Sequence, residues 1–169
     1  MKLKYKIIII ISCVFIFLYF FIILWYNGLI WPNTPSKKKY PVRGVDVSSY
    51  QGEIDWETLE NQDIDFAFIK ATEGSGYEDE YFQQNFQNAS ETGIRIGAYH
   101  FFSFDSSGIT QAENFIKTVP KTQNMLPPVI DLEFYAQHGS DPPEKEETRY
   151  NLQKMIDAVY DYYGLMTVI

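Results

Sequence analysis

From residue 42 onward, short apolar runs alternate with longer stretches of helical character, and this alternation restricts the possible folds more than any other feature of the sequence. The apolar runs have the length of strands and lie at residues 43–48, 66–72, 94–101 and 128–133. The helix-like stretches lie at residues 56–61, 80–92, 110–119 and 144–163. Strands that alternate with helices indicate βα units and a parallel sheet. We therefore predict an α/β fold, for which a doubly wound sheet and a barrel are both open.

Residue types that favour helix ends support these boundaries. Asp55 can cap the first helix, and Ser107 or Thr110 the third, because short polar side chains accept hydrogen bonds from the free N–H groups of a first turn. Gly93 and Gly164 lie where C-terminal caps are expected. No Gly-rich phosphate loop follows the first strand, which argues against a nucleotide-binding sheet.

The N-terminus carries an apolar run of a different kind. Residues 7–26 contain no charged side chain, and three lysines precede them. Twenty helical residues at about 1.5 Å each span about 30 Å, the thickness of a membrane's hydrocarbon core. A cleaved signal peptide usually has a shorter apolar core and a small-residue cleavage site, which is missing here. We therefore expect residues 1–27 to form a single-pass anchor in the cell membrane, and residues 28–41, with three prolines and three lysines, to form a linker to a domain outside the cytoplasm.

Charge and cysteine content exclude several kinds of site. Residues 41–169 carry eight basic and 22 acidic side chains, hence a formal charge of −14, so we expect no nucleic-acid partner. The single cysteine, Cys13, lies in the apolar run and cannot serve a thiolate metal site in the domain. The two histidines, His100 and His138, have no supporting ligand spacing, so we expect no metal and no cofactor. His100 is expected to be structural, and His138, in a loop of Gly, Asp and Pro, to be exposed.

Acidic residues end two of the predicted strands. Asp131 and Glu133 are two residues apart, so they share one face of a strand with Val129. Asp46 and Ser48 share a face at the end of the first strand. The carboxyl ends of barrel strands are where active sites lie. Two nearby carboxylates raise the pKa of one of them, and the protonated one can donate to a leaving oxygen, as in glycoside hydrolysis. Either motif taken alone also fits a solvated strand end.

Polar and aromatic residues end the two middle strands as well. Lys70 and Glu73 lie near the exit of the second strand, and Tyr99, His100 and Phe101 near that of the third. The rings of Tyr99 and Phe101 are able to stack on the faces of sugars.

As a set, these motifs resemble glycoside hydrolase family 25, the N-acetylmuramidases or lysozymes. The resemblance lies in the order and spacing of residues 43–52, 66–74, 97–102 and 128–133. It implies an irregular eight-stranded β/α barrel, and a β-1,4 bond between N-acetylmuramic acid and N-acetylglucosamine of bacterial peptidoglycan as the substrate.

The resemblance also implies roles for individual side chains. Glu133 would be the general acid, Asp131 would orient or polarise the acetamido group or stabilise the cationic transition state, and Asp46 would support the site. Sugar-subsite residues are expected to be Tyr99, Glu73, Lys70, Phe101 and Ser48. Attack by water, by an enzyme nucleophile or by the substrate's own acetamido group stays open, because substrate assistance is a known exception to the two-carboxylate scheme.

The chain departs from the family at its end. Residues 165–169 resemble the opening of a fifth strand, and the family takes a further aspartate and aromatic residues from its last strands. We therefore expect residues 42–169 to form an incomplete TIM-like (β/α) barrel, the N-terminal two thirds of a catalytic domain. Two functions follow: a membrane-held lysozyme that takes part in cell wall catabolism, or an inactive remnant that binds wall glycans.

Overall fold

The computed structural model describes residues 3–26, 35–62 and 64–169, and the chain divides into two units, Met1–Pro41 and Val42–Ile169. The first unit contains helix α1 (Leu3–Tyr26), which is apolar on all sides and buries none of its residues. Among the described residues α1 is the one helix long and apolar enough to cross a membrane, a test that a signal sequence also passes. Half of the predicted linker, residues 28–34, lies outside the described residues.

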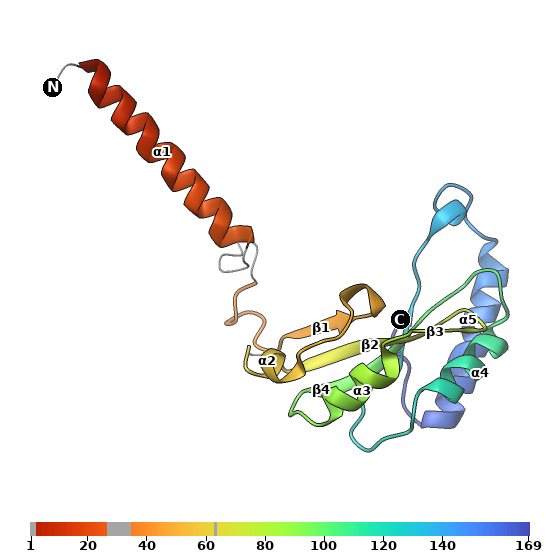
Figure 1. Cartoon of the computed structure of the whole chain (residues 1–169). Helices are drawn as coiled ribbons and strands as arrows, with labels where there is room; N and C mark the ends of the chain where they lie inside the picture. Colours follow the sequence, from red (N-terminus) through yellow and green to blue (C-terminus); the bar gives the residue numbers. More distant parts are fainter. Residues whose placement is uncertain (1–2, 27–34, 63) are drawn as a thin grey trace. The chain divides into compact units, whose positions relative to one another are not determined.

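The second unit is built on a sheet whose parallel strands follow the order of the chain (Figure 1). The neighbouring strands are β1 (Gly44–Val47), β2 (Phe66–Glu73), β4 (Arg95–Phe101) and β5 (Val129–Asp131). The short β3 (Tyr77–Glu78) turns back antiparallel on the end of β2, and Val168 forms a parallel bridge with Val129 beyond β5. A doubly wound sheet reverses its strand order at a switch point. The described strands show no such reversal, so the α/β prediction is confirmed with strands in chain order.

Helices connect these strands. They are α2 (Trp56–Glu60), α3 (Phe82–Ser90), α4 (Gly108–Thr118) and α5 (Lys145–Tyr163), with short 3-10 helices η1 (Ser49–Gln51) and η2 (Ala136–Gly139). The Asp55 side chain accepts a hydrogen bond of 2.9 Å from the backbone N–H of Thr58, as predicted for a cap. Ser107 caps α4 in the same way, and Gly164 ends α5 with a left-handed φ of 70°. The prediction that Gly93 caps a helix is wrong. Helix α3 ends at Ser90, and its C-cap residue is Glu91, whose backbone is in the right-handed helical region.

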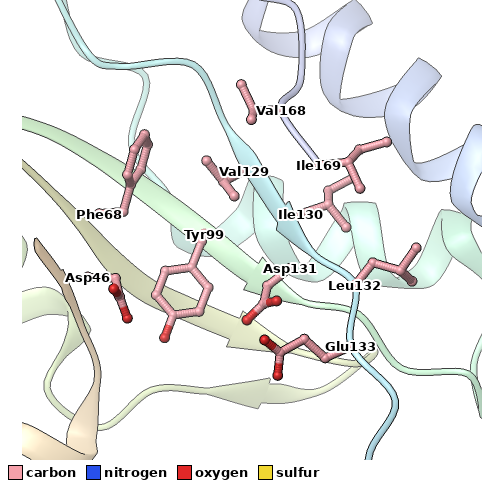
Figure 2. A pocket seen from close by; sticks show the side chains of 10 residues that line it. All are labelled: Asp46, Phe68, Tyr99, Val129, Ile130, Asp131, Leu132, Glu133, Val168 and Ile169. Atoms are coloured by element: carbon pink, nitrogen blue, oxygen red, sulfur yellow. The ribbon is translucent and has the colours of Figure 1, made fainter. Parts of the chain in front are cut away.

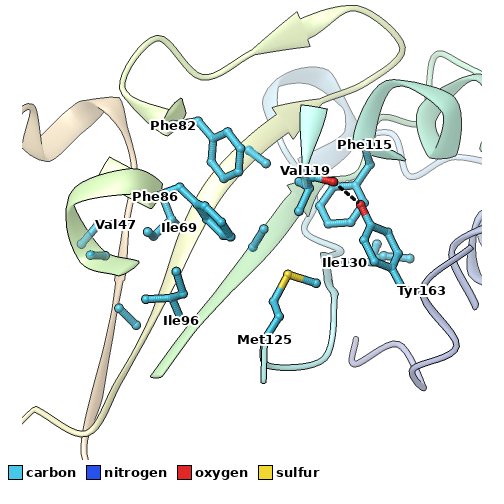
Figure 3. Close-up of a cluster of buried hydrophobic side chains, with 14 of the residues drawn as sticks. Val47, Ile69, Phe82, Phe86, Ile96, Phe115, Val119, Met125, Ile130 and Tyr163 are labelled. Carbon is cyan, nitrogen blue, oxygen red and sulfur yellow. Dashed lines mark hydrogen bonds between the residues drawn. The ribbon is translucent and has the colours of Figure 1, made fainter. Parts of the chain in front are cut away.

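The two faces of the sheet have different surroundings. On one face, Ala67, Ile69 and Ala98 are fully buried, and their small or compact side chains let α3 and α4 pack closely. Aromatic rings of the helices, among them Phe82 and Phe115, complete this core (Figure 3). The opposite face carries half-buried rings and the predicted acids, listed from β1 to β5 as Asp46, Phe66, Phe68, Tyr99, Phe101 and Asp131. One face is therefore a packed core and the other is open.

Strand β2 contains an irregularity that the sequence did not predict. Lys70 lies opposite Tyr99 of β4, but Thr72 lies opposite His100, so Ala71 is an extra residue between them. In a regular strand, residues three apart point to opposite faces. The bulge at Ala71 instead brings Lys70 and Glu73 to the same, open face.

Candidate active site

An open cleft of about 550 Å³ lies on the open face, at the carboxyl ends of the strands (Figure 2). Its lining residues come from β1, β2, β4, β5 and the chain end: Asp46, Phe68, Tyr99, Val129, Ile130, Asp131, Leu132, Glu133, Val168 and Ile169. Acidic groups lie at one end of this cleft and apolar side chains, including Phe68 and Val129, at the other (Figure 2). The cleft can therefore hold a ligand that has both polar substituents and apolar surface.

Three of the predicted acids converge in the cleft. Asp46 lies in β1, Asp131 is the last residue of β5, and Glu133 follows two residues later. The carboxylates of Asp131 and Glu133 face each other, and that of Asp46 lies on the same side of the sheet, next to the hydroxyl of Tyr99 (Figure 2). The acid pair thus lies on the predicted face, although β5 ends at Asp131 and Glu133 follows outside the strand. Glu133 is exposed, whereas Asp131 is half-buried.

The acids and Tyr99 influence one another electrostatically. Partial burial raises the pKa of Asp131, the negative charges of Glu133 and Asp46 raise it further, and the positive charge of Lys70 opposes them. Of the two acids near β5, Asp131 is thus a group that holds its proton more tightly than a free carboxyl. Burial, and then the charges of Asp46 and Asp131, also raise the pKa of Tyr99, so its hydroxyl stays protonated and is able to donate a hydrogen bond.

Three predicted subsite residues form a cluster beside the cleft and are not among the residues that line it. The ammonium of Lys70 lies 2.7 Å from Oε2 of Glu73. It also lies 4.9 Å from the ring centroid of Phe101 and 5.7 Å from that of Tyr77. Lys70 is only 9% exposed as a result.

Ser48 is buried and is also absent from the cleft lining. Its hydroxyl accepts a hydrogen bond of 3.3 Å from the backbone N–H of Tyr50, and its own N–H donates to Oε1 of Gln51 at 2.9 Å. Ser48 therefore caps η1, which follows β1 directly.

His100 is fully buried and structural, as expected. Its Nε2 lies 3.0 Å from Oε1 of Gln111, whose Nε2 donates to the carbonyls of Ser103 and Ser106. Oε1 of Gln111 must then accept, so Nε2 of His100 carries the hydrogen and Nδ1 accepts from the hydroxyl of Thr72 at 2.7 Å. Burial lowers the pKa of His100 to about 4.

The prediction that His138 is exposed is wrong. His138 is 9% exposed and packs edge-on against Phe104 and Tyr135, with ring centroids 5.1 and 5.4 Å away. The polar loop around it folds back over the β4–α4 connection, where the Tyr135 hydroxyl contacts the side chain of Ser103 at 3.1 Å. Loop composition alone did not indicate this burial.

Sequence reasoning also missed Phe68 and Asp79. Phe68 lines the cleft, and the signal for it was available, since it lies two residues before Lys70 on the same face of β2. Asp79 is buried, and its carboxylate accepts hydrogen bonds from the backbone N–H groups of Ser49 at 2.9 Å and Tyr81 at 3.1 Å. It ties η1 to the segment after β3, a contact between distant parts of the chain that no local pattern indicates.

Comparison with known proteins agrees with this architecture. The family model for glycosyl hydrolases family 25 matches residues 45–169. Lysozyme M1 from Streptomyces globisporus is 43% identical over 96 residues, which cover 54% of this chain and 33% of that protein. An N,O-diacetylmuramidase from Chalaropsis is 32% identical over 134 residues, which cover 75% of this chain and 62% of that protein.

A solved structure supports the same relationship. A family 25 glycosyl hydrolase from Bacillus anthracis matches with a TM-score of 0.74 and 56% sequence identity, over 75% of this chain and 58% of that chain. The chain thus spans between about one third and two thirds of the length of these relatives. The family model covers most of this chain, which therefore belongs to glycosyl hydrolase family 25.

Proposed function

We propose that this protein is a lysozyme-type glycoside hydrolase that cleaves the β-1,4 bond between N-acetylmuramic acid and N-acetylglucosamine in peptidoglycan. The observation that carries the proposal is the convergence of Asp46, Asp131 and Glu133 in one cleft at the carboxyl ends of parallel strands. Relatives of this chain are named lysozyme and N,O-diacetylmuramidase, which supports this substrate class.

In the proposed reaction, Glu133 is the general acid. Its exposed position at the mouth of the cleft allows it to donate a proton to the glycosidic oxygen as the bond to the anomeric carbon breaks. Asp131, the last residue of β5, would act on the acetamido group or the developing cation through its ionised carboxylate. Asp46 adds negative charge from β1.

The remaining lining groups would bind the sugar ring. The hydroxyl of Tyr99, which stays protonated, would donate a hydrogen bond to a sugar oxygen. Phe68 and Val129 offer an apolar floor to the C–H face of a pyranose. Phe101, with Lys70 and Glu73, lies at the edge of this subsite, and Ser48 supports it through η1.

The same proposal includes the domain arrangement. Parallel strands in chain order, with helices on one face, are the arrangement found in a segment of a TIM-like (β/α) barrel, and the open face would then be the barrel interior. We assign residues 42–169 to this catalytic domain and residues 28–41 to a linker. Helix α1 would hold the domain on the outer face of the cytoplasmic membrane as a single-pass anchor, next to the glycan strands of the wall.

Replacement of Glu133 by Gln tests the assignment of the acid. The change keeps the shape of the side chain and removes the proton, so the release of reducing ends from purified peptidoglycan should fall by about 10²–10⁴-fold. Asp131→Asn should cost a comparable factor, since it removes the charge that faces the acetamido group or the cation. Glu113→Gln, at an exposed position on α4, is the matched control and should keep wild-type activity.

Two outcomes would count against the proposal. Wild-type activity in Glu133→Gln would show that the acid pair is structural. A wild-type protein that binds peptidoglycan in a pull-down assay and releases no reducing ends would instead be a glycan-binding remnant.

A further inference from the structure

The general acid of the proposed reaction lies outside the sheet. Strand β5 ends at Asp131, whose carbonyl accepts a hydrogen bond of 2.9 Å from the N–H of Phe102. Glu133 follows two residues later, at an exposed position, and its carboxylate nevertheless faces that of Asp131 in the cleft (Figure 2). A second attachment beyond Glu133 is needed to fix the course of this segment, because a chain held at one end only is free to turn.

We propose that Tyr135 provides this attachment and is a positioning residue for Glu133, because it fastens the chain two residues beyond the acid to the β4–α4 connection. Residues 132–134 are thereby held at both ends, by β5 and by Tyr135. The catalytic part of this inference rests on the proposed function, whereas the attachment itself stands on the contacts in the structure.

The hydroxyl of Tyr135 lies among three polar groups of the β4–α4 connection. It accepts a hydrogen bond of 3.3 Å from the backbone N–H of Phe104. It also lies 3.1 Å from Oγ of Ser103 and 3.4 Å from Oδ2 of Asp105. A phenol hydroxyl has one hydrogen to donate and two lone pairs, so these three partners can satisfy it completely.

The ring of Tyr135 is held by aromatic neighbours from separate parts of the chain. It stacks on Phe104, with centroids 5.7 Å apart and an interplanar angle of 21°. It also contacts Phe101 of β4 and His138 of η2, each with centroids 5.4 Å apart. Aromatic pairs at such distances stabilise a contact beyond the burial of their area. Phe134 stacks on the same Phe104 ring at 5.8 Å, so two successive residues of the segment contact the β4–α4 connection.

The part of this connection that Tyr135 contacts is itself fixed. The N–H of Ser103 donates to Oε1 of Gln111 at 2.8 Å, and the carbonyl of Ser103 accepts from Nε2 of Gln111 at 2.9 Å. Gln111 lies in α4, is fully buried and also contacts Nε2 of His100 at 3.0 Å. The hydroxyl of Tyr135 is thus connected through Ser103 to a hydrogen-bonded network in the core of the domain.

This attachment has a consequence for the reaction. A general acid has to lie within hydrogen-bond reach of the oxygen that it protonates. A misplacement of about 1 Å can cost about 10²-fold in rate. Tyr135 is not among the residues that line the cleft, so its effect on the rate would be exerted through the position of Glu133.

The test measures the mobility of Glu133 without substrate. The backbone order parameter of its amide is determined by ¹⁵N relaxation on the full-length protein in detergent micelles, where a rigid backbone gives about 0.85 and a flexible one less than about 0.6. Tyr135→Leu, which removes the ring and the hydroxyl, should lower the value from the rigid to the flexible range. Tyr135→Phe, which keeps the ring, should lower it less. Tyr150→Leu, at an exposed position on α5, is the matched control and should leave it unchanged.

A rigid Glu133 amide in folded Tyr135→Leu would overturn the proposal, and so would a flexible one in the wild-type protein. A urea midpoint close to that of the wild type establishes that the variant is folded. If Tyr135→Leu does not fold, Tyr135→Phe decides, because the loss of one hydroxyl leaves the ring packing in place. An order parameter at the wild-type value in Tyr135→Phe would then refute the role of Tyr135.

Kinetics separate this inference from the proposed function. A loss of order at Glu133 in a protein that does not cleave peptidoglycan would leave the attachment intact and refute the lysozyme assignment. In an active protein, Tyr135→Leu should lower kcat by about 10²-fold with KM nearly unchanged, whereas a tyrosine that bound sugar would raise KM. The same change in a Glu133→Gln background should cost no further activity, because the acid that it positions is already absent. A further loss in that background would show that Tyr135 acts on another group.

Discussion

At the scale of single residues, His100 shows how a polar group is accommodated in the core. Both ring nitrogens have partners, Thr72 and Gln111, and the ring lies edge-on to Phe115 with centroids 6.2 Å apart. In the neutral tautomer, Nε2–H donates to Gln111 and Nδ1 accepts from the hydroxyl of Thr72. A second proton, on Nδ1, would turn this acceptor into a donor and break the bond in which Thr72 donates. Burial of the charge, more than any single neighbour, lowers the pKa.

The pH dependence of stability follows from that pKa. The folded state binds the proton of His100 only near pH 4, whereas the unfolded chain binds it near 6.5. The contribution of His100 to the free energy of unfolding should therefore have its full value above about pH 6.5. It should fall by about 3 kcal/mol as the pH drops to about 4. Asp131, whose pKa is raised, acts in the opposite direction, because its ionisation costs stability as the pH rises through its titration.

Urea unfolding of the full-length protein in micelles, at about pH 7 and about pH 4, measures this loss. His100→Gln, which keeps a donor toward Gln111 and cannot be charged, should lose less between the two values. A variant that lost as much as wild type would assign the acid sensitivity to other groups.

At the level of secondary structure elements, α4 and α5 are in close contact at Gly108. The N–H of Gly108 donates to Oδ1 of Asn151 at 3.2 Å, and a Cβ on Gly108 would collide with the backbone carbonyl oxygen of Asn151. Gly108→Ala should therefore destabilise the fold by about 1–3 kcal/mol, although alanine is the better helix former by about 1 kcal/mol. Gly76→Ala is the control, since its Cβ would meet no atom within 4 Å.

Urea midpoints of the two glycine variants give the comparison. Equal stability of Gly108→Ala and wild type would mean that the two helices can separate without cost.

The elements differ in how well the sequence predicts them. Strand positions, the caps at Asp55 and Ser107 and the shared face of Asp131 and Glu133 follow from local periodicity and residue type, and these predictions are confirmed. The bulge at Ala71 depends on the register with β4, which no pattern within β2 contains. The two-residue strand β3 is too short to show any period.

The site was predicted to the same extent and for the same reasons. Residues that end parallel strands were expected to meet, and Asp46, Tyr99, Asp131 and Glu133 do line one cleft. The burial of Lys70 could not be predicted, because it requires the hairpin to place Tyr77 over it.

For the whole molecule, the contrast is between an apolar helix and an acidic domain. If α1 is an anchor, the full-length protein should pellet with membranes, resist carbonate extraction and keep its N-terminus by mass spectrometry. Phe15→Lys with Ile16→Lys, in the middle of α1, should release it, because each lysine at the centre of a bilayer costs about 2.5–3.5 kcal/mol. Thr122→Lys with Gln123→Lys adds the same charge to an exposed loop of the domain and should leave the protein in the membrane fraction.

Protein in the medium that begins near residue 28 would identify α1 as a cleaved signal sequence.

The alternation of strands and helices indicated the fold class without deciding between a doubly wound sheet and a barrel. That choice depends on which strands are neighbours, and the observed order β1, β2, β4, β5 follows the chain.

The bulge at Ala71 also has a genetic consequence. Loss of that one codon in frame would leave a regular strand, in which Lys70 and Glu73 were two residues apart and kept their places opposite Tyr99 and Phe101 of β4. Thr72 would keep its place opposite His100, but the carbonyl of Ala71, which accepts a hydrogen bond of 2.9 Å from the N–H of Asp79, would be lost. We expect many substitutions of Ala71 by small residues to be tolerated, while an alignment of related genes should show no gap between codons 70 and 73.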